Sequence, residues 1–364
     1  MKIAIIPWNE DYYNNRIFDV ENRKLNRDHL MTPYFFMKKE FEKNGDELNT
    51  VDLYDDLSKV DYFLFFDFIQ EWLIRLSRLG LEGRMIYCNG EPEVVKPMNS
   101  KAGYEKLKKY FPYIMTWNDD LIDDERIFKR IIPYFFEKRP GAKPFAKKKL
   151  LTNISGNKFS HDEKELYSER ERLITYFEQN YASQFDLYGA GWDIKEHPSY
   201  KGKPENKYEV YHNYRFALSL ENTKGVKGYV TEKIFDCIVA DIVPIYQGAD
   251  DILDYVPKEC FIDYSQFTSM SELADFLVHM SEEEYSVYLE AMHDFLESDM
   301  IRKLDGAEYA KNIYHVITKK TQPDFRINWK EKLILFTGAE KSRISTAIKK
   351  EVYPVYCRII KRRK

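Results

Sequence analysis

An acidic and a basic side chain stand next to each other within residues 228–248, GYVTEKIFDCIVADIVPIYQG. Glu232 and Lys233 follow Thr231 at the point where the pattern predicts the start of a helix. One interpretation is an ordinary helix start, with Thr231 as the N-cap and Glu232 in the first turn. The other is a polar pocket that holds a charged ligand at the end of a sheet. The residues before Gly228 help to decide between these two interpretations.

Those residues favour a site for an anion. Residues 215–220, RFALSL, are typical of a buried strand, and a glycine-containing loop leads from them to the helix start. A strand, a loop and a helix in this order present backbone N–H groups and the positive end of the helix dipole to an anion. Lys233 adds a cation, Asn222 an amide, Tyr229 a ring with a hydroxyl, and Glu232 a carboxylate for paired ribose hydroxyls. This set suits a nucleoside diphosphate.

Alternating segments predict the elements that position these residues. In the first half, apolar runs typical of strands take turns with amphipathic stretches typical of helices. The strand-like runs are 2–8, 48–54, 62–68 and 84–90, and the helix-like stretches are 32–45, 69–80 and 100–111. Such alternation favours an α/β fold with a mostly parallel sheet covered on both faces.

A break near residue 140 predicts a domain boundary. Residues 137–151, EKRPGAKPFAKKKLL, combine prolines, a glycine and a run of lysines, although a solvated loop inside one domain is the alternative. A second alternating series follows the break and ends in a stretch at 269–296 that is typical of one long helix. We therefore expect one domain at 1–140 and another at 148–322, with a ligand cleft between them at the carboxyl ends of the strands.

Residues 323–364 form a basic tail. Ile344, Ile348 and Val352 are spaced four residues apart, which predicts a helix with one apolar face, although Pro354 would interrupt it. Two interpretations stay open: peripheral contact with an anionic membrane, or a terminal helix packed on its own protein.

The composition is typical of a globular protein and gives no reason to expect nucleic acid as the main partner. The chain has 364 residues, of which 44% are hydrophobic and 32% charged, with a net charge of −4. No run is as long and apolar as a membrane span, and residues 1–8 are typical of a strand rather than a secretion signal. Four scattered cysteines are typical of reduced thiols in a cytoplasmic protein.

Several motifs are absent. The chain has no GxxxxGK[ST], HExxH or GxSxG, and GAG at 189–191 is only half of a dinucleotide fingerprint. We expect His197 and His212 at packing or surface positions. The doublets Asp119–Asp120 and Asp250–Asp251 are expected to be solvated or to cap helices. The sequence therefore predicts no metal site.

Three of the segments quoted above resemble a known signature. RFALSLEN, GYVTEKIFD and DIVPIYQG are similar to the donor-site pattern of the α-1,3/4-fucosyltransferases, glycosyltransferase family 10, in its bacterial form. Leu220 replaces the usual Phe, and Gln247 precedes the final Gly. The specific part covers residues 214–248, and weaker similarity extends over 84–320.

The resemblance implies a GT-B architecture, in which two Rossmann-like domains face a central cleft and the second binds GDP-fucose. Asn222, Tyr229, Glu232 and Lys233 would contact the donor. The family also places a pyrophosphate-binding arginine on the first helix of the second domain. Arg170 fits this position better than Arg172 because of the apolar spacing that follows it.

The resemblance also implies a general base in the first domain. The family places a Glu there after a strand and a Gly, which corresponds to Glu91 after Gly90, with Glu93 as the second choice. Such a base would take the proton of the acceptor hydroxyl in a single inverting displacement. Lys233, the arginine and the helix start would stabilise the leaving GDP. No cofactor is then required, and a divalent cation such as Mn²⁺ or Mg²⁺ would at most stimulate.

The expected activity is transfer of L-fucose from GDP-β-L-fucose to a glycan that contains galactose or N-acetylglucosamine. Acceptors would be of the lactose or N-acetyllactosamine type, joined through an α-1,3 or α-1,4 linkage. A bacterial setting suggests lipopolysaccharide or capsule glycans, made in the cytoplasm or at the inner membrane. The alternatives are a GT-B transferase with another nucleotide-sugar donor and a non-catalytic carbohydrate-binding protein.

Overall fold

A six-stranded parallel sheet forms the centre of the first lobe in the computed structural model, which describes residues 1–337. Its strand order is β2-β1-β3-β4-β5-β6. β3 and β4 are buried along their whole length, because helices cover both faces of the sheet. The side chains of these two strands are accordingly apolar on both faces. The strands are β1 (Lys2–Ile6), β2 (Glu47–Thr50), β3 (Tyr62–Phe65), β4 (Met85–Cys88), β5 (Tyr113–Thr116) and β6 (Ile127–Lys129).

Two pairs of helices cover this sheet. Helices α1 (Thr32–Lys43) and α9 (Gly306–Thr318) pack on one face, where Met37 and Phe41 share a core with Ile313 and Ile317. Helices α2 (Gln70–Arg78) and α3 (Lys101–Leu107) pack on the other. The amphipathic patterns of the sequence thus become the two helical layers.

The second lobe has a five-stranded parallel sheet of order β11-β10-β9-β7-β8. The order reverses between β7 and β9, so the carboxyl ends of these two strands border the crevice where open α/β sheets bind ligands. The strands are β7 (Lys149–Ile154), β8 (Phe185–Tyr188), β9 (Tyr214–Leu220), β10 (Val243–Gln247) and β11 (Ile262–Asp263). The helices are α4 (Tyr167–Asn180), α5 (Lys207–Tyr211), α6 (Glu232–Ile238), α7 (Met270–His279) and α8 (Glu282–Glu297).

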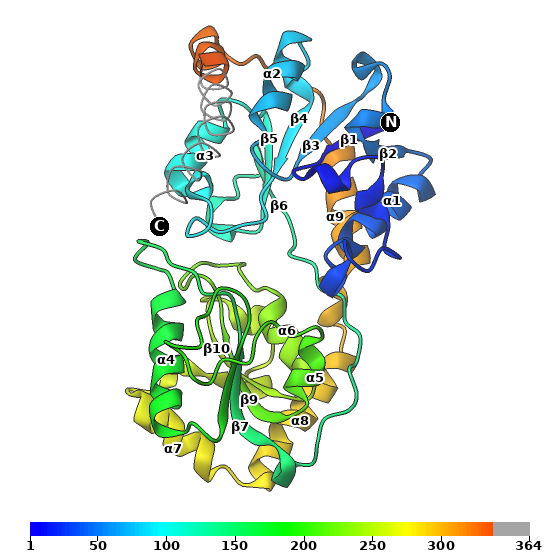
Figure 1. Cartoon of the computed structure of the whole chain (residues 1–364). Coiled ribbons are helices and arrows are strands. Elements are labelled where there is room, and N and C mark those ends of the chain that lie inside the picture. Colours follow the sequence, from blue (N-terminus) through cyan, green and yellow to red (C-terminus); the bar gives the residue numbers. More distant parts are fainter. Residues whose placement is uncertain (338–364) are drawn as a thin grey trace, which may run out of the picture.

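The chain crosses between the lobes twice, as Figure 1 shows. After β6 it reaches the second lobe at Tyr134, whose ring joins that lobe's core beside Phe235 at a centroid distance of 5.1 Å. After Leu304 it returns, and α9 packs beside α1. The lobes therefore do not divide as expected at 1–140 and 148–322, because Tyr134 packs in the second lobe and α9 packs in the first. The amphipathic pattern of α9 does not specify which lobe buries its apolar face.

One expected helix is divided into two. Residues 269–296 had suggested a single long helix, but α7 ends at His279 and α8 begins at Glu282. Ser281 and Glu284 form a capping box, in which the Ser281 hydroxyl accepts the Glu284 N–H at 3.1 Å and the Glu284 carboxylate accepts the Ser281 N–H at 2.8 Å. This reciprocal cap starts a new helix.

The described part of the tail packs on the first lobe. Residues 329–337 are helical, Leu335 is buried, and the Lys332 Nζ lies 2.6 Å from the buried carboxylate of Glu82. Ile344, Ile348, Val352 and the basic cluster lie outside the described residues. Within residues 1–337, no helix combines the length and apolarity needed to cross a membrane. The three cysteines of this range are buried and free.

Candidate active site

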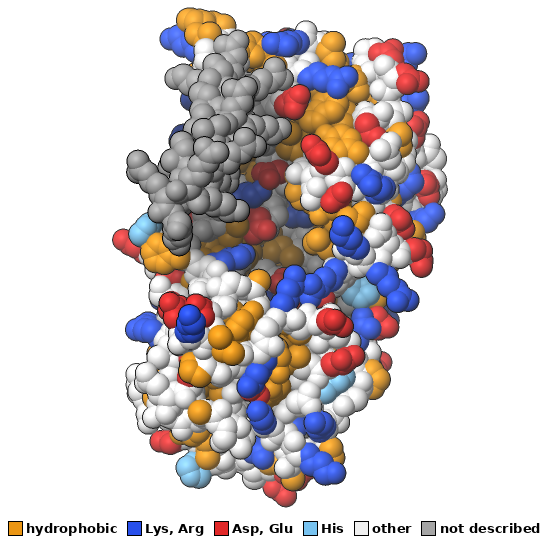
Figure 2. Space-filling model, in the orientation of Figure 1, with side chains coloured by type: hydrophobic (Ala, Val, Ile, Leu, Met, Phe, Trp, Pro, Cys, Tyr) orange, Lys and Arg blue, Asp and Glu red, His pale blue; other side chains and the backbone are white. Residues whose placement is uncertain are grey.

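A cavity of about 910 Å³ lies between the lobes. Its second-lobe wall is built at the carboxyl ends of β7 and β9 by Ser155, Gly156, Arg170, Asn222 and the start of α6. Its first-lobe wall comes mainly from the segment after β1 and from the start of α1, including Asn9, Asp11, Thr32 and Tyr34. Figure 2 shows the surface hollowed between the lobes, with lysine and arginine side chains along one edge of the hollow.

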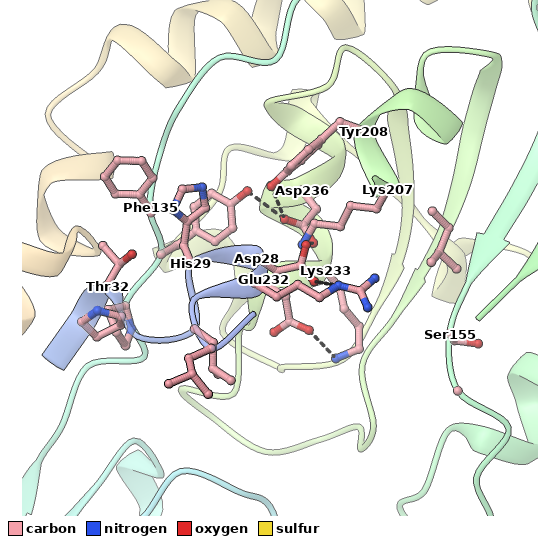
Figure 3. Close-up of a pocket in the computed structure, with 18 of the residues that line it drawn as sticks. Asp28, His29, Thr32, Phe135, Ser155, Lys207, Tyr208, Glu232, Lys233 and Asp236 are labelled. Carbon is pink, nitrogen blue, oxygen red and sulfur yellow. Dashed lines mark hydrogen bonds and ion pairs between the residues drawn. The ribbon is translucent and has the colours of Figure 1, made fainter. Parts of the chain in front are cut away.

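Four of the predicted donor residues meet in this cavity. Arg170 from α4, Asn222 after β9, and Glu232 and Lys233 from α6 all line it. Figure 3 shows Glu232 and Lys233 at its second-lobe side, with Asp28 and His29 of the first lobe opposite. Tyr229 and Glu91 are not among the lining residues. Arg172 points away: its side chain is 69% exposed and pairs with Glu169.

A buried carboxylate organises the start of α6. Glu221 has no exposed surface and accepts the Thr231 N–H at 2.8 Å, the Thr231 hydroxyl at 2.8 Å and the Lys233 ammonium at 2.9 Å. Thr231 occupies the N-cap position, but its side chain makes no cap hydrogen bond. Its hydroxyl donates to Glu221 instead. This role of Glu221 was not predicted, although the Glu stands directly before Asn222.

Lys233 carries a positive charge at the cavity edge. Burial works to lower its pKa, but the charges of Glu221 and Glu232 outweigh burial, and the pKa lies above its usual value. The ammonium also donates to the Thr231 hydroxyl at 3.0 Å. Without a ligand, Lys233 is thus held by groups on its own lobe.

Arg170 is a buried cation that pairs with no carboxylate among residues 1–337. It is 4% exposed, and its Nη2 donates to the carbonyl oxygens of Leu220 at 2.6 Å and Glu221 at 2.9 Å. Burial lowers its pKa, yet a guanidinium stays protonated at any working pH. The second sheet therefore places a cation at the carboxyl end of β9.

Glu232 offers a carboxylate to the same space. Its side chain is 57% exposed but lies in the crevice between the lobes, 3.8 Å from the Lys233 Nζ. Burial would raise its pKa, but the positive charges of Lys233 and Lys207 lower it by more. The carboxylate is therefore ionised at neutral pH and can accept hydrogen bonds from hydroxyl groups.

Tyr229 lies at the contact between the lobes. It is 3% exposed, its ring centroid is 4.7 Å from that of Trp117 in the first lobe, and its hydroxyl accepts a hydrogen bond from Asn222 at 3.3 Å. The ring is therefore covered by Trp117. Tyr229 does not line the cavity itself, but its hydroxyl is hydrogen-bonded to Asn222, which does.

Gly228 explains how closely this loop approaches the first lobe. Its φ is +79°, and a Cβ at this position would lie 2.2 Å from the Trp117 carbonyl oxygen. Its N–H donates to both carboxylate oxygens of Asp251, at 3.0 and 2.9 Å. Asp251 was expected to cap a helix through its side chain; it makes no such bond and holds the Gly228 loop instead.

Glu91 follows β4 and faces the second lobe. Its side chain is exposed, and its charge adds to burial in raising the pKa of Tyr229 and of Tyr167 on α4. Its backbone is held by Asn89, which accepts the Glu91 N–H at 3.0 Å, and by Asn99, which donates to the Glu91 carbonyl at 2.7 Å. Glu93 is partly buried.

A charged cluster at one end of the cavity was not predicted. Asp236 pairs with Lys207 at 2.6 Å and accepts hydrogen bonds from the hydroxyls of Tyr134 at 2.9 Å and Tyr208 at 3.2 Å. Burial raises its pKa from 3.8 to about 6, although Lys207 opposes the shift. Lys207 also lies 3.7 Å from Asp28, so the cluster links the lobes.

The histidines and acids of the described chain provide no metal centre. Residues 1–337 contain no group of three or more His, Cys, Asp or Glu side chains placed to hold an ion. His197 is a packing residue, with its Nδ1 2.9 Å from Glu178 and its ring against Trp192. The ring Nε2 of His212 lies 2.7 Å from the Arg139 carbonyl oxygen.

Two parallel α/β lobes with a cavity at the carboxyl ends of the second sheet define the GT-B architecture of two-domain glycosyltransferases. A solved structure of an α1,3-fucosyltransferase matches with a TM-score of 0.56 at 15% identity, covering 90% of this chain and 92% of the other. A DNA-modifying β-glucosyltransferase matches with a TM-score of 0.52 at 13% identity, covering 87% of this chain and all of the other, 100%. At such identities the likeness concerns the fold.

Part of the chain is similar to glycosyltransferase family 10. Residues 145–312 match the model described as glycosyltransferase family 10 (fucosyltransferase), C-terminal part. The rat α-(1,3)-fucosyltransferase 7 is 40% identical over 226 residues, which cover 59% of this chain and 54% of the relative. An α-(1,4)-fucosyltransferase of Arabidopsis thaliana is 44% identical over 78 residues, 21% of this chain and 19% of the relative. For the α-(1,3)-fucosyltransferase FucT of Helicobacter pylori the identity is 35% over 106 residues, 29% of this chain and 21% of the relative. The matched part thus spans between about a fifth and about half of these relatives.

Proposed function

We propose that this protein transfers L-fucose from GDP-β-L-fucose to a hydroxyl group of a glycan, with inversion at the anomeric carbon. The observation that supports this most directly is the meeting of Arg170, Lys233, Glu232 and Asn222 in one cavity at the switch point of the second sheet. Several similar proteins are named fucosyltransferases, and one structural neighbour was solved with GDP-fucose.

The cavity suits a sugar nucleotide in a defined orientation. Arg170 and Lys233 would bind the diphosphate, since charge-assisted hydrogen bonds to phosphate oxygens are short and strong. Glu232 would accept hydrogen bonds from the two ribose hydroxyls of the nucleotide. Asn222 would form a hydrogen bond to the donor next to these hydroxyls. Lys233 would then divide its hydrogen bonds between Glu221 and the phosphate.

The reaction would be a single displacement. The acceptor oxygen attacks the anomeric carbon of fucose on the face opposite GDP, and the carbon–oxygen bond to the β-phosphate breaks with its electron pair on GDP. Glu91 takes the proton of the attacking hydroxyl. Arg170 and Lys233 stabilise the charge that grows on the phosphate, as fixed cations in a preorganised site. No step requires a metal ion.

The acceptor would enter from the first lobe. Asn9, Asp11, Thr32 and Tyr34 line that wall with amide, carboxylate and hydroxyl groups able to bind sugar hydroxyls. We propose acceptors of the lactose or N-acetyllactosamine type, linked α-1,3 or α-1,4.

Incubation with GDP-fucose and a panel of β-galactosides tests this proposal, with mass and linkage analysis of the products. We expect a fucosylated product and GDP, undiminished by EDTA, and no product from UDP- or ADP-sugars. Glu91→Gln should keep GDP affinity and lose transfer. Turnover with another nucleotide sugar alone, or none with any donor, would overturn the proposal.

A further inference from the structure

Arg130 is a buried cation on the first-lobe side of the cavity. It follows β6, is 7% exposed and lines the cavity. Its Nη1 donates to the carbonyl oxygen of Asn89 at 2.5 Å, and its Nη2 donates to the Tyr309 hydroxyl at 3.3 Å. Its guanidinium carbon lies 5.6 Å from the ring centroid of Phe66 and 5.3 Å from that of Tyr309.

This arginine has no acidic partner. Throughout residues 1–337 no carboxylate lies within ion-pair distance of its guanidinium, and its Nε has no hydrogen-bond partner. Removing a charge from water without an opposite charge costs several kcal/mol. Aromatic faces, one carbonyl and one hydroxyl return only part of that. For stability alone, an apolar side chain would serve better here.

Its strongest contact leads directly to Glu91. Arg130 holds the Asn89 carbonyl, and the Asn89 side chain accepts the Glu91 N–H at 3.0 Å. Between them, a Cβ on Gly90 would lie 3.7 Å from the Arg130 Nη1, so the guanidinium lies against this turn. The Asn89 amide is itself held by the Tyr104 hydroxyl at 2.6 Å. Arg130 therefore supports the turn that presents Glu91 to the second lobe.

The neighbouring titratable groups leave the charge of Arg130 uncompensated. Burial is the main cause that raises the pKa of each of them, so all stay uncharged near neutral pH. The groups around the guanidinium are Tyr34 of α1, Cys88 of β4, Tyr104 of α3 and Tyr309 of α9. The groups that face Glu91 are Tyr167 of α4 and Tyr229.

We propose that Arg130 is a positioning residue for Glu91: it fixes the Asn89–Gly90–Glu91 turn and places a positive charge beside it. This inference rests on the proposed function, which makes Glu91 the general base. The turn needs such support because its middle residue is a glycine and because an error of about 1 Å in a catalytic group can reduce the rate roughly 100-fold.

Arg130→Met and Arg130→Lys in the full chain test the inference, with Arg126→Met as the matched control. Arg126 also holds backbone carbonyls of the first lobe, those of Lys108 at 2.6 Å and Phe111 at 2.8 Å, but does not line the cavity. We expect kcat for the glycan acceptor to fall roughly 100-fold in Arg130→Met and less in Arg130→Lys. The affinity for GDP should stay within about twofold of wild type.

Azide provides a second readout. It attacks the anomeric carbon without a proton to remove, so it needs no base, and the products are fucosyl azide and GDP. In Arg130→Met, transfer to azide should stay near the wild-type rate while transfer to the glycan falls. Equal loss with azide and glycan, or loss of GDP affinity, would overturn the inference. A wild-type protein that fails to turn over GDP-fucose would instead overturn the proposed function.

Discussion

The ammonium of Lys233 lies 2.9 Å from the fully buried carboxylate of Glu221. One cation therefore serves two purposes: it neutralises a charge inside the second lobe, and it lines the cavity where a diphosphate would bind. Sequence reasoning alone would assign Lys233 to the ligand and expect its removal to leave folding intact. The structure shows that removal also leaves a buried acid without its cation.

Replacement of Lys233 by Met should therefore reduce both transfer and stability. We expect kcat/KM to fall at least roughly 100-fold and the free energy of unfolding to fall by roughly 1–3 kcal/mol, because Glu221 keeps only its bonds from Thr231. Glu221→Gln in the Lys233→Met background should recover much of the stability and none of the activity. Urea unfolding and a GDP-release assay measure the two effects. Recovery of activity in the double variant would contradict a role in phosphate binding.

The two arginines of α4 should behave oppositely. Arg170→Met removes a buried cation from the cavity, and we expect the Kd for GDP to rise by roughly 100-fold. Arg172→Met changes an exposed residue paired with Glu169 and should leave the Kd within about twofold. Isothermal titration with GDP measures both. A larger loss in Arg172→Met would reverse the assignment.

Asp236 should make stability depend on pH in a defined direction. Its pKa is about 6 in the folded protein against the usual 3.8, so between these values the folded protein holds a proton that the unfolded chain releases. From this group alone, the free energy of unfolding therefore rises as pH falls from about 6 toward 3.8. Asp236→Asn should remove that rise. Urea unfolding at pH 7, 6 and 5 measures the slope, and an equal slope in both proteins would refute the shift.

Gly228→Ala should damage the contact between the lobes. The new Cβ would lie 2.2 Å from the Trp117 carbonyl oxygen at a φ of +79°, so the loop before α6 must move. We expect a loss of stability of about 1–3 kcal/mol and a raised KM for the donor. Gly202→Ala is the matched control, because Gly202 has a φ of +91° but no atom within 4 Å of its Cβ position. If both variants lost similar amounts of stability, the strained dihedral angle alone would explain the loss, without any contact between the lobes.

Local patterns in the sequence were enough to predict both parallel sheets and the start of α6. Buried parallel strands need apolar side chains on both faces, and such runs are visible at β3, β4 and β9 without a structure. The donor-site signature likewise lies within one strand–loop–helix unit, so its residues are neighbours in the chain before they are neighbours in space. The predicted meeting of Asn222, Glu232 and Lys233 depends on that unit alone.

Contacts between distant segments could be decided only by the tertiary structure. The apolar face of α9 could have packed on either lobe, and complementarity with α1 places it on the first. Tyr229 looked like a stacking surface, but Trp117, from the other lobe, covers it. Glu221 and Arg130 gain their roles from burial and from partners that no local pattern reveals. The sequence by itself determined which groups lie at each strand end; the packing of the lobes decided which of them face the cavity, because burial and pairing depend on segments far apart in the chain.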